Sequence, residues 1–486
     1  MRAALGLFLA LWALLAAAAP QRLDGSLRLT YEDLRLPGDE WMGLVGLGRH
    51  LAVGHGAYAA LAAYGAVTGR RGGFFTGGFE LGWQRRWRAW EASAGLFLGG
   101  GGGGAAPQGG GLMLRPHAGV ARVWGAWSLG VQGSWVRFPN GAIDSRQLAL
   151  SVERRWPLWL ASGWRDGAFP WPARAHRQWF GVQSSHYFPR PGTVSRGGRP
   201  LERVDLIGVR WRPHLHGPWY LDMETAGAWG GGVDGYAQVL AGPSLWRPLR
   251  GRSAWGGGLM LGAAGGGTVD TGGGIVGRAW AGLSLPLSGR WSLDLNGGVT
   301  AAREGGFTAA TVTAGLLHGV NVARPVRGTP APVAWHRWRV RPAWQRYFGL
   351  GVEDRKSARL AAVPVDLVGI KLERILDRGL YLGGQAWGAF DGGAGGYAVG
   401  FWGVGWERRA GPWRPWLELD LGAAGGGGMA VGPGVLAQPM LGLSRVWGRV
   451  GSLSFALGRV HALAGPLSAW VLEAALSYRF STPGMP

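Results

Sequence analysis

A hydroxyl and an imidazole on one face of an expected strand are the first groups in this chain that could do chemistry. In QSSHYF, Ser184 and Ser185 precede His186, and a serine hydrolase needs a hydroxyl activated by an imidazole within hydrogen-bond reach. Side chains alternate between the two faces of a strand, so Ser184 can pair with His186 whereas Ser185 cannot. No carboxylate partner for the imidazole is evident in the sequence, and we predict no catalytic residues.

The sequence contains no pattern that indicates a metal site or a phosphate-binding loop. His214 and His216 in PHLHG offer two imidazoles on one side of a turn, but a metal site needs three or four ligands. The glycine runs Gly99–Gly104 and Gly265–Gly267 are followed neither by Gly-Lys-Ser/Thr nor by a helix start, so they are not phosphate loops. Zero Cys excludes thiolate metal sites, disulfides and thiol catalysis. We predict no metal and no cofactor.

Acidic side chains recur instead at every second position of apolar segments. In WLELDLGAAG, Leu417, Leu419 and Leu421 alternate with Glu418 and Asp420. This period of two indicates a β-strand with one apolar and one polar face. Such a strand is expected to meet an apolar medium outside and a polar interior inside. The expected lumenal polar groups, including one arginine that could pair with the carboxylates, are Asp222, Glu224, Asp294, Glu418, Asp420 and Arg459.

Strands of this kind divide the first third of the chain into eight segments, and the same eight can be drawn in the other two thirds. Their length of about 9–11 residues is what a tilted membrane-crossing strand needs. In the first third they are expected near Ser26–Leu34, Gly43–Leu51, Ala57–Ala66, Phe74–Gln84, Trp90–Leu98, Leu112–Val123, Trp127–Phe138 and Gln147–Arg155.

The connections between these strands are of two alternating kinds. VTGRRGG and GGGGAAPQGG are Gly-rich and polar, whereas WQRRWRAW and VWGAW carry Trp. Trp that recurs at one end of the strands is typical of the interfacial aromatic girdle of a membrane barrel. A soluble sandwich or barrel is the alternative. The girdle is expected to comprise Trp87, Trp90, Trp124, Trp127, Trp246, Trp255, Trp291, Trp413, Trp416 and Trp447.

A glycine-rich motif shows that the chain is a threefold repeat. LGAAGGG begins at Leu261, LGAAGGGG at Leu421 and LGGGGGG at Leu98, at intervals of 163 and 160 residues (261 − 98 and 421 − 261). Other glycines return in step, among them Gly65, Gly227 and Gly388. Three copies of one unit of about 161 residues therefore make up almost the whole chain, and each should be a domain or a large part of one. The glycines are expected to permit tight hairpins and close strand packing.

The N-terminal residues predict export. Arg2, an apolar run from Ala3 to about Leu15 and small residues through Ala19 form the layout of a signal peptide; a retained membrane anchor is the alternative. No later segment approaches the roughly 18 apolar residues of a membrane helix. The net charge of +22 is nearly all Arg. Nucleic acid is implausible for an exported chain, and anionic lipid or lipopolysaccharide is the expected counter-charge.

The last strand carries a resemblance to a known class. AALSYRF, ending at Phe480, is similar to the closing strand of Gram-negative outer-membrane barrels, whose final aromatic residue the insertion machinery reads. Taken as architecture, the whole chain resembles small barrels of the OmpX and OmpA types placed in tandem. The implied fold class is all-β, a transmembrane antiparallel up-and-down β-barrel of about 24 strands arranged as three tandem eight-stranded barrels.

One barrel of 24 strands is the alternative architecture. The periplasmic turns of a continuous barrel are normally short. The copies in this chain are instead joined by longer linkers that contain proline. A barrel of that size also needs a plug, and strands and loops use up the whole chain. The expected boundaries are signal peptide 1–20, repeat 21–156, linker 157–175, repeat 176–320, linker 321–334, repeat 335–480 and tail 481–486.

One segment of the first repeat invites comparison with an enzyme family. VRFPNGAIDSRQLAL faintly resembles the His-Ser-Asn strand end of the outer-membrane lipid A deacylases, which are also eight-stranded. Arg137, Phe138 and Pro139 precede Asn140 here, so neither His nor Ser stands where that motif needs it. We expect a loop apex at this place.

These patterns predict an exported protein of the Gram-negative outer membrane that is not an enzyme. The role placed first is structural or surface-interacting, with Gly/Arg loops that meet lipopolysaccharide. A porin-like channel for small solutes is the alternative, and a lipid A-modifying enzyme is the third. The expected partners are outer-membrane lipid, lipopolysaccharide and the outer-membrane insertion machinery, with no nucleic acid.

Overall fold

The computed structural model of this chain describes residues 20–249, 251 and 253–485. The predicted signal peptide, residues 1–20, lies outside the described residues apart from Pro20. The described chain is almost entirely β-strand, and successive strands pair antiparallel. The prediction of an all-β, antiparallel up-and-down barrel fold is therefore confirmed. No helix among the residues described has the length and apolarity that crossing a membrane requires.

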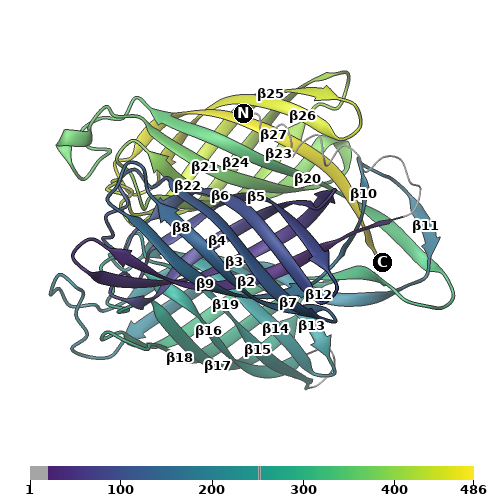
Figure 1. The fold of residues 1–486 in the computed structure, drawn as a ribbon, viewed down its shortest axis with the longest axis horizontal. Coiled ribbons are helices and arrows are strands. Elements are labelled where there is room, and N and C mark those ends of the chain that lie inside the picture. The colour runs from purple at the N-terminus through teal and green to yellow at the C-terminus, as the bar shows by residue number, and fades with distance from the viewer. Residues whose placement is uncertain (1–19, 250, 252, 486) are drawn as a thin grey trace.

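The strands of the first repeat form a closed barrel, which we call ring 1. β2 pairs with both β3 and β9, so the eight strands β2–β9 close on themselves. These strands lie in the middle of Figure 1, in purple. Their bounds are β2 Gly25–Leu36, β3 Glu40–Gly54, β4 Ala57–Gly69, β5 Phe75–Trp87, β6 Trp90–Gly102, β7 Met113–Trp124, β8 Trp127–Arg137 and β9 Asp144–Arg155.

The strands of the second repeat pair in the same manner, and we call them ring 2. β12 pairs with both β13 and β19. Ring 2 is the teal set at the bottom of Figure 1. Its strands are β12 Ala173–Pro189, β13 Val204–His216, β14 Trp219–Gly230, β15 Ala237–Pro248, β16 Ala254–Gly265, β17 Ile275–Pro286, β18 Trp291–Ala302 and β19 Thr308–Pro325.

The third repeat gives ring 3, in which β20 pairs with both β21 and β27. Two short 3₁₀ helices, η1 (Ala358–Leu360) and η2 (Asp377–Gly379), lie in its connections. Ring 3 is the green-to-yellow set at the top of Figure 1. Its strands are β20 Ala331–Phe348, β21 Val365–Ile375, β22 Leu380–Asp391, β23 Ala398–Glu407, β24 Trp413–Gly425, β25 Val435–Trp447, β26 Gly451–Ala462 and β27 Ser468–Gly484.

A small sheet, which we call the joint, ties rings 2 and 3 into one continuous nineteen-stranded sheet. It contains β1 (Gln21–Leu23), β10 (Leu158–Ser162) and β11 (Ala168–Trp171) together with the ends of β12, β19, β20 and β27. Parts of the segments expected as linkers and tail are thus strands, because their backbone groups pair across repeats. Burial, with a smaller effect of Arg374, lowers the pKa of His336 in the joint to about 4, so this imidazole is neutral at pH 7.

Each ring has two distinct ends. The connections after the first, third, fifth and seventh strands are loops, and we call this the loop end. The other connections are short, such as His55–Gly56 between β3 and β4, and we call this the turn end. The joint lies at the turn end, on the right in Figure 1.

Alternation of side chains decides which face of a strand points inward. On β24, Leu417, Leu419 and Leu421 remain 49–53% exposed on the outside, whereas Glu418 and Asp420 are buried inside ring 3. The rings thus carry apolar side chains outward and polar side chains inward, the reverse of a barrel that folds in water.

Most of the tryptophans expected in the girdle do lie outward at the turn end. Trp87, Trp90, Trp124, Trp127, Trp255, Trp291 and Trp413 are 44–51% exposed, and Trp447 is half-buried. The prediction is wrong for Trp246 and Trp416, because their side chains point into the rings and not outward to a girdle. Trp246 packs against Trp280 with ring centroids 5.6 Å apart, and Trp416 is 1% exposed inside ring 3.

The repeated glycine motif is where the rings touch one another. The third strand of each ring packs against the fifth strand of the next: β4 against β16, β14 against β24, and β22 against β6. The same glycine position carries each contact. A Cβ added to Gly65 would lie 3.1 Å from Ala263 Cβ, one on Gly227 3.6 Å from Ala423 Cβ, and one on Gly388 2.7 Å from the Gly100 carbonyl oxygen. This head-to-tail interface closes after three steps, as it does in a cyclic trimer.

A side chain at Gly388 should therefore push rings 1 and 3 apart. For Gly388→Val we expect a loss of about 1–3 kcal/mol of unfolding free energy, the usual range for overpacking, measured by denaturant titration in detergent micelles. Gly133→Val is the control, since the space around an added Cβ there is open, with Ala118 O at 3.9 Å. Equal stability of both variants would contradict the close contact.

Candidate functional site in the ring lumens

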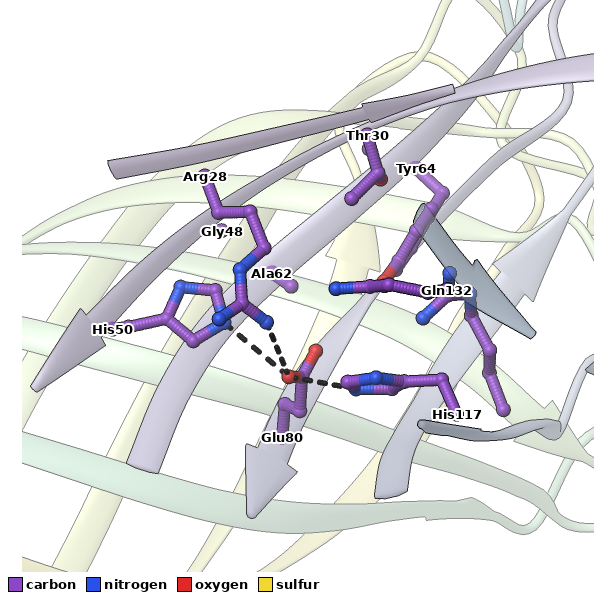
Figure 2. A pocket seen from close by; sticks show the side chains of 11 residues that line it. Arg28, Thr30, Gly48, His50, Ala62, Tyr64, Glu80, His117 and Gln132 are labelled. Atoms are coloured by element: carbon purple, nitrogen blue, oxygen red, sulfur yellow. Dashed lines mark hydrogen bonds and ion pairs between the residues drawn. The ribbon is translucent and has the colours of Figure 1, made fainter. Parts of the chain in front are cut away.

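A single carboxylate organises the middle of the lumen of ring 1. Glu80 Oε1 accepts hydrogen bonds from Tyr58 Oη at 2.7 Å and His117 Nε2 at 3.0 Å, and it lies 3.3 Å from His50 Nε2. The guanidinium of Arg28 is 3.8 Å from the same oxygen. Figure 2 shows Arg28, His50 and His117 converging on Glu80 from different strands. All these side chains are buried.

A second set of charges extends this cluster along the ring. Arg115 Nε lies 2.7 Å from Glu32 Oε1, and Ser134 and Gln147 also donate to Glu32. Arg28 Nε lies 2.6 Å from Glu153 Oε2, nearer the turn end. Each buried charge thus meets an opposite charge, as burial in a low dielectric requires.

The two clusters border a cavity of about 10 Å³ in ring 1 (Figure 2). Four polar atoms of its lining are buried without a protein partner: His50 Nδ1, His117 Nδ1, Arg115 Nη2 and Gln132 Oε1. A polar cavity of this size has room for about one water molecule. The centre of ring 1 is therefore polar and suited to hold water.

Strand alternation places these groups inward, but the Glu80 cluster is absent from the lumenal residues that were expected from the sequence. On β2, inward Arg28 and Glu32 alternate with outward Leu29, which is 48% exposed. His50, Glu80 and His117 stand on β3, β5 and β7, so no short motif joins them. Their position inside a barrel was predictable from the period of two; their convergence depended on strand register.

Ring 2 holds three of the predicted lumenal carboxylates in two groups of ion pairs. Asp222 Oδ1 lies 2.5 Å from Arg210 Nε and 3.0 Å from Arg212 Nε, and Arg212 continues to Asp294 at 2.6 Å. Glu224 lies 2.9 Å from Arg278 Nη1. All six residues are buried.

Ring 3 holds the other two predicted carboxylates, Glu418 and Asp420, and a lysine pairs with the first of them. Lys371 Nζ lies 2.5 Å from Glu418 Oε1 and 3.3 Å from Glu473 Oε2, and Asp420 is buried on the same strand as Glu418. Arg459 corrects the prediction. It is an outward position of β26, where its guanidinium lies over the ring of Trp470 at 5.7 Å.

The lumens are closed by apolar side chains toward the loop end. In ring 1 a buried cluster includes Leu34, Met42, Phe74, Phe97 and Phe138; the rings of Phe74 and Phe138 pack edge to face with centroids 5.9 Å apart. Rings 2 and 3 contain similar clusters. In this conformation, passage along a lumen would require these side chains to move.

The other residues that the sequence suggested for chemistry lie outside the charged clusters in the lumens of the rings. His214 Nε2 is 2.8 Å from the Gly217 carbonyl oxygen at a turn, and the described residues contain no group of three potential metal ligands. Asn140 lies in the connection between β8 and β9, as expected for a loop apex. Ser184 and His186 do share an outward face, and the structure adds a carboxylate that the sequence analysis missed.

No protein-family model and no curated protein matches the chain. Similar solved structures include OccAB3 of Acinetobacter baumannii, at 10% identity and a TM-score of 0.23 over 95% of this chain and 99% of that one. OccK8 (OprE) of Pseudomonas aeruginosa gives 9% and 0.24 over 95% and 98%. OccK2 (OpdF) of Pseudomonas aeruginosa, in complex with glucuronate, gives 12% and 0.21 over 95% and 98%. Likeness this low transfers neither strand arrangement nor binding site.

The comparison nevertheless corrects the role that the sequence analysis placed first. Among the similar solved structures, opdK is an outer membrane protein of Pseudomonas aeruginosa, and OccK2 was solved in complex with glucuronate. The structural or surface-interaction role is therefore given up as a correction, and the porin-like alternative takes its place as a proposal.

The location follows from the outer surface of the rings. The outward leucines, valines and tryptophans need an apolar solvent, and closed antiparallel strands satisfy their backbone groups within lipid. The chain is an outer-membrane β-barrel protein.

Proposed function

We propose that this protein passes ion-sized solutes across the outer membrane through the polar lumens of its rings. The supporting observation is the lumen of ring 1, where buried ionisable side chains surround a cavity whose lining includes four unpartnered polar atoms. Groups of this kind can bind a small ion or water in turn, once the apolar cluster at the loop end moves aside. Larger solutes do not fit, because side chains fill an eight-stranded barrel.

The proposal includes the architecture of three tandem eight-stranded transmembrane barrels rather than one barrel of 24 strands. It is supported by the pairing of the first strand with the last in each repeat. The small OmpX and OmpA types are the barrels it resembles. Outer-membrane lipid and lipopolysaccharide would surround the rings, and the insertion machinery would read the closing strand near Phe480.

Current recordings on the full chain in planar bilayers test this proposal. We expect ion currents in steps far smaller than those of an open water-filled pore. Steps of nanosiemens size would contradict three filled rings and favour a single wide barrel. Currents no larger than those of the protein-free bilayer would overturn the permeation function itself.

Widening the cavity of ring 1 should increase the current. Gln132 lines the cavity, its Oε1 has no partner, and the side chain is buried. Gln132→Gly would therefore enlarge the space without breaking a hydrogen bond of that oxygen, and we expect a larger single-channel step. Val131→Gly is the matched control, because Val131 is the outward neighbour on β8 and is 44% exposed. An equal increase in both variants would exclude ring 1 as the path.

A further inference from the structure

A serine, a histidine and an aspartate form a hydrogen-bonded chain on the outside of ring 2. Ser184 Oγ lies 3.4 Å from His186 Nε2, and His186 Nδ1 lies 2.7 Å from Asp205 Oδ1. Ser184 and His186 share the outward face of β12, and Asp205 on β13 is the cross-strand partner of His186. Hydroxyl, imidazole and carboxylate thus follow one another in the order that activates a serine nucleophile.

The surroundings differ along this chain of three groups. Asp205 is 1% exposed, whereas the imidazole of His186 is 38% exposed and Ser184 is half-buried. The carboxylate is therefore fixed inside the wall while the reactive end is open to the medium outside the ring. A buried carboxylate on Nδ1 holds the imidazole with Nε2 free to take a proton from the hydroxyl.

A β-bulge brings an indole beside the histidine. Asp205 pairs with Gly230 and Leu206 with Ala228, so Trp229 is the extra residue of the bulge. Its ring meets the imidazole of His186 edge-on, with centroids 6.2 Å apart, and its Nε1 is buried without a hydrogen-bond partner. Bulges often re-aim a side chain next to a functional site. This free N–H is a candidate donor to an oxyanion formed near Ser184.

The neighbouring surface is apolar on one side of the site and cationic on the other. Outward Val182 and Ile207 flank Ser184 on β12 and β13 and are 41% and 45% exposed. The connection that follows β12 at the loop end bears a cluster of arginines, and Arg203 Nε lies 2.8 Å from Asp205 Oδ2. The arginines of this segment are Arg190, Arg196, Arg199 and Arg203. An anionic lipid fits this gradient, with its acyl chain on the valine and isoleucine and its phosphate on the arginines.

The corresponding positions of the other rings show what a purely structural pairing looks like here. In ring 3, Arg346 and Asp366 form a double ion pair at 2.8 and 2.7 Å, and Trp344 Nε1 donates to the same carboxylate. In ring 1, Tyr31 donates to Asp33 at 2.8 Å. The first pairing joins two strands of the wall, the second joins two residues of one strand, and neither contains an imidazole. Ring 2 alone combines a hydroxyl, an imidazole and an indole N–H without a partner.

We propose that Ser184, His186 and Asp205 form an acyl-ester hydrolase site that acts on phosphate-bearing lipids of the outer leaflet. Ser184 Oγ attacks the ester carbonyl carbon while its proton passes to His186 Nε2. The carbon–oxygen ester bond then breaks, and the imidazolium protonates the departing alcohol. Water, deprotonated by His186, attacks the acyl-serine, Ser184 regains the proton, and a free fatty acid leaves. One ester and one water thus give one acid and one alcohol.

The test uses the full chain, reconstituted separately with phosphatidylethanolamine vesicles and with lipopolysaccharide. We expect fatty-acid release from one or both, which identifies the lipid source, and labelling of the serine by a fluorophosphonate. Ser184→Ala should reduce the release at least about 10³-fold and abolish the label. Asp205→Asn, which would disturb the orientation of the imidazole, should lower the rate while keeping Ser184 in place.

Matched variants separate chemistry from folding. Ser185→Ala changes an inward serine bonded to Thr313, and Asp366→Asn alters the corresponding pair in ring 3; both should keep the wild-type rate. Heat-dependent gel mobility reports whether each variant forms its barrels. Absence of release and label in the wild-type chain with both lipids would overturn the proposal, as would unchanged release from folded Ser184→Ala.

Discussion

Asp222→Ala is expected to lower the unfolding free energy by about 3–5 kcal/mol, the usual effect of removing one partner from a buried ion pair. Asp222 is fully buried in ring 2 and receives Arg210 and Arg212 on one oxygen. Without it, Arg210 loses its carboxylate and Arg212 retains only Asp294. The measurement is denaturant titration of the folded chain in detergent micelles, monitored by Trp fluorescence.

Two further variants show whether the loss arises from stranded charge. Asp24→Ala removes the exposed partner of Arg22, where both side chains are more than half exposed, so the change should stay below about 1 kcal/mol. Replacing Asp222, Arg210 and Arg212 together by apolar residues of similar size should recover most of the stability. A triple variant as unstable as Asp222→Ala would contradict the view that these charges mainly satisfy one another.

The period of two made the inside and outside of each strand predictable. Asp222, Glu224, Asp294, Glu418 and Asp420 are buried inside, where they alternate with outward neighbours that are mostly apolar. Arg459 was misplaced because its sign of charge, rather than its parity on β26, guided the expectation. Trp246 and Trp416 were misplaced for a similar reason, since a tryptophan near a strand end fits a girdle or a lumen equally well and only parity decides.

Contacts that depend on register could not be obtained from one sequence. Asp205 lies 19 residues from His186 along the chain, yet antiparallel pairing sets the two side by side. The shared face of Ser184 and His186 was therefore predictable from the sequence, whereas their carboxylate partner was not. The Glu80 cluster of ring 1 depends in the same manner on the mutual positions of β3, β5 and β7.

The glycine repeat was predictable from the sequence, but its contact with the neighbouring ring was not. Close strand packing was expected from its small residues, and the structure shows that the packing is between rings, at Gly65, Gly227 and Gly388. A repeat period reports that three units exist and cannot report which faces meet. The threefold recurrence of one contact explains why this motif returns when the lumenal charges do not.

A charge on the outer face provides the strongest test that lipid is the solvent of the rings. Leu441 is at the middle of β25 and is 67% exposed on the outside of ring 3. Leu441→Arg should cost about 2–4 kcal/mol of folding free energy in lipid vesicles, as arginine does near the midplane of a membrane barrel. The measurement is reversible denaturant titration in the presence of vesicles.

The control for this prediction is the same substitution at a strand end, where the side chain would lie near the membrane interface. Leu380 begins β22 at the turn end of the same ring and is 44% exposed. At the membrane interface an arginine costs only about 0–1 kcal/mol, so Leu380→Arg should change the stability little. Water outside the rings would make both substitutions equally mild, because an exposed arginine needs no partner in water. A difference that follows the position along the strand, and not the exposed fraction alone, is the signature of a bilayer around the protein.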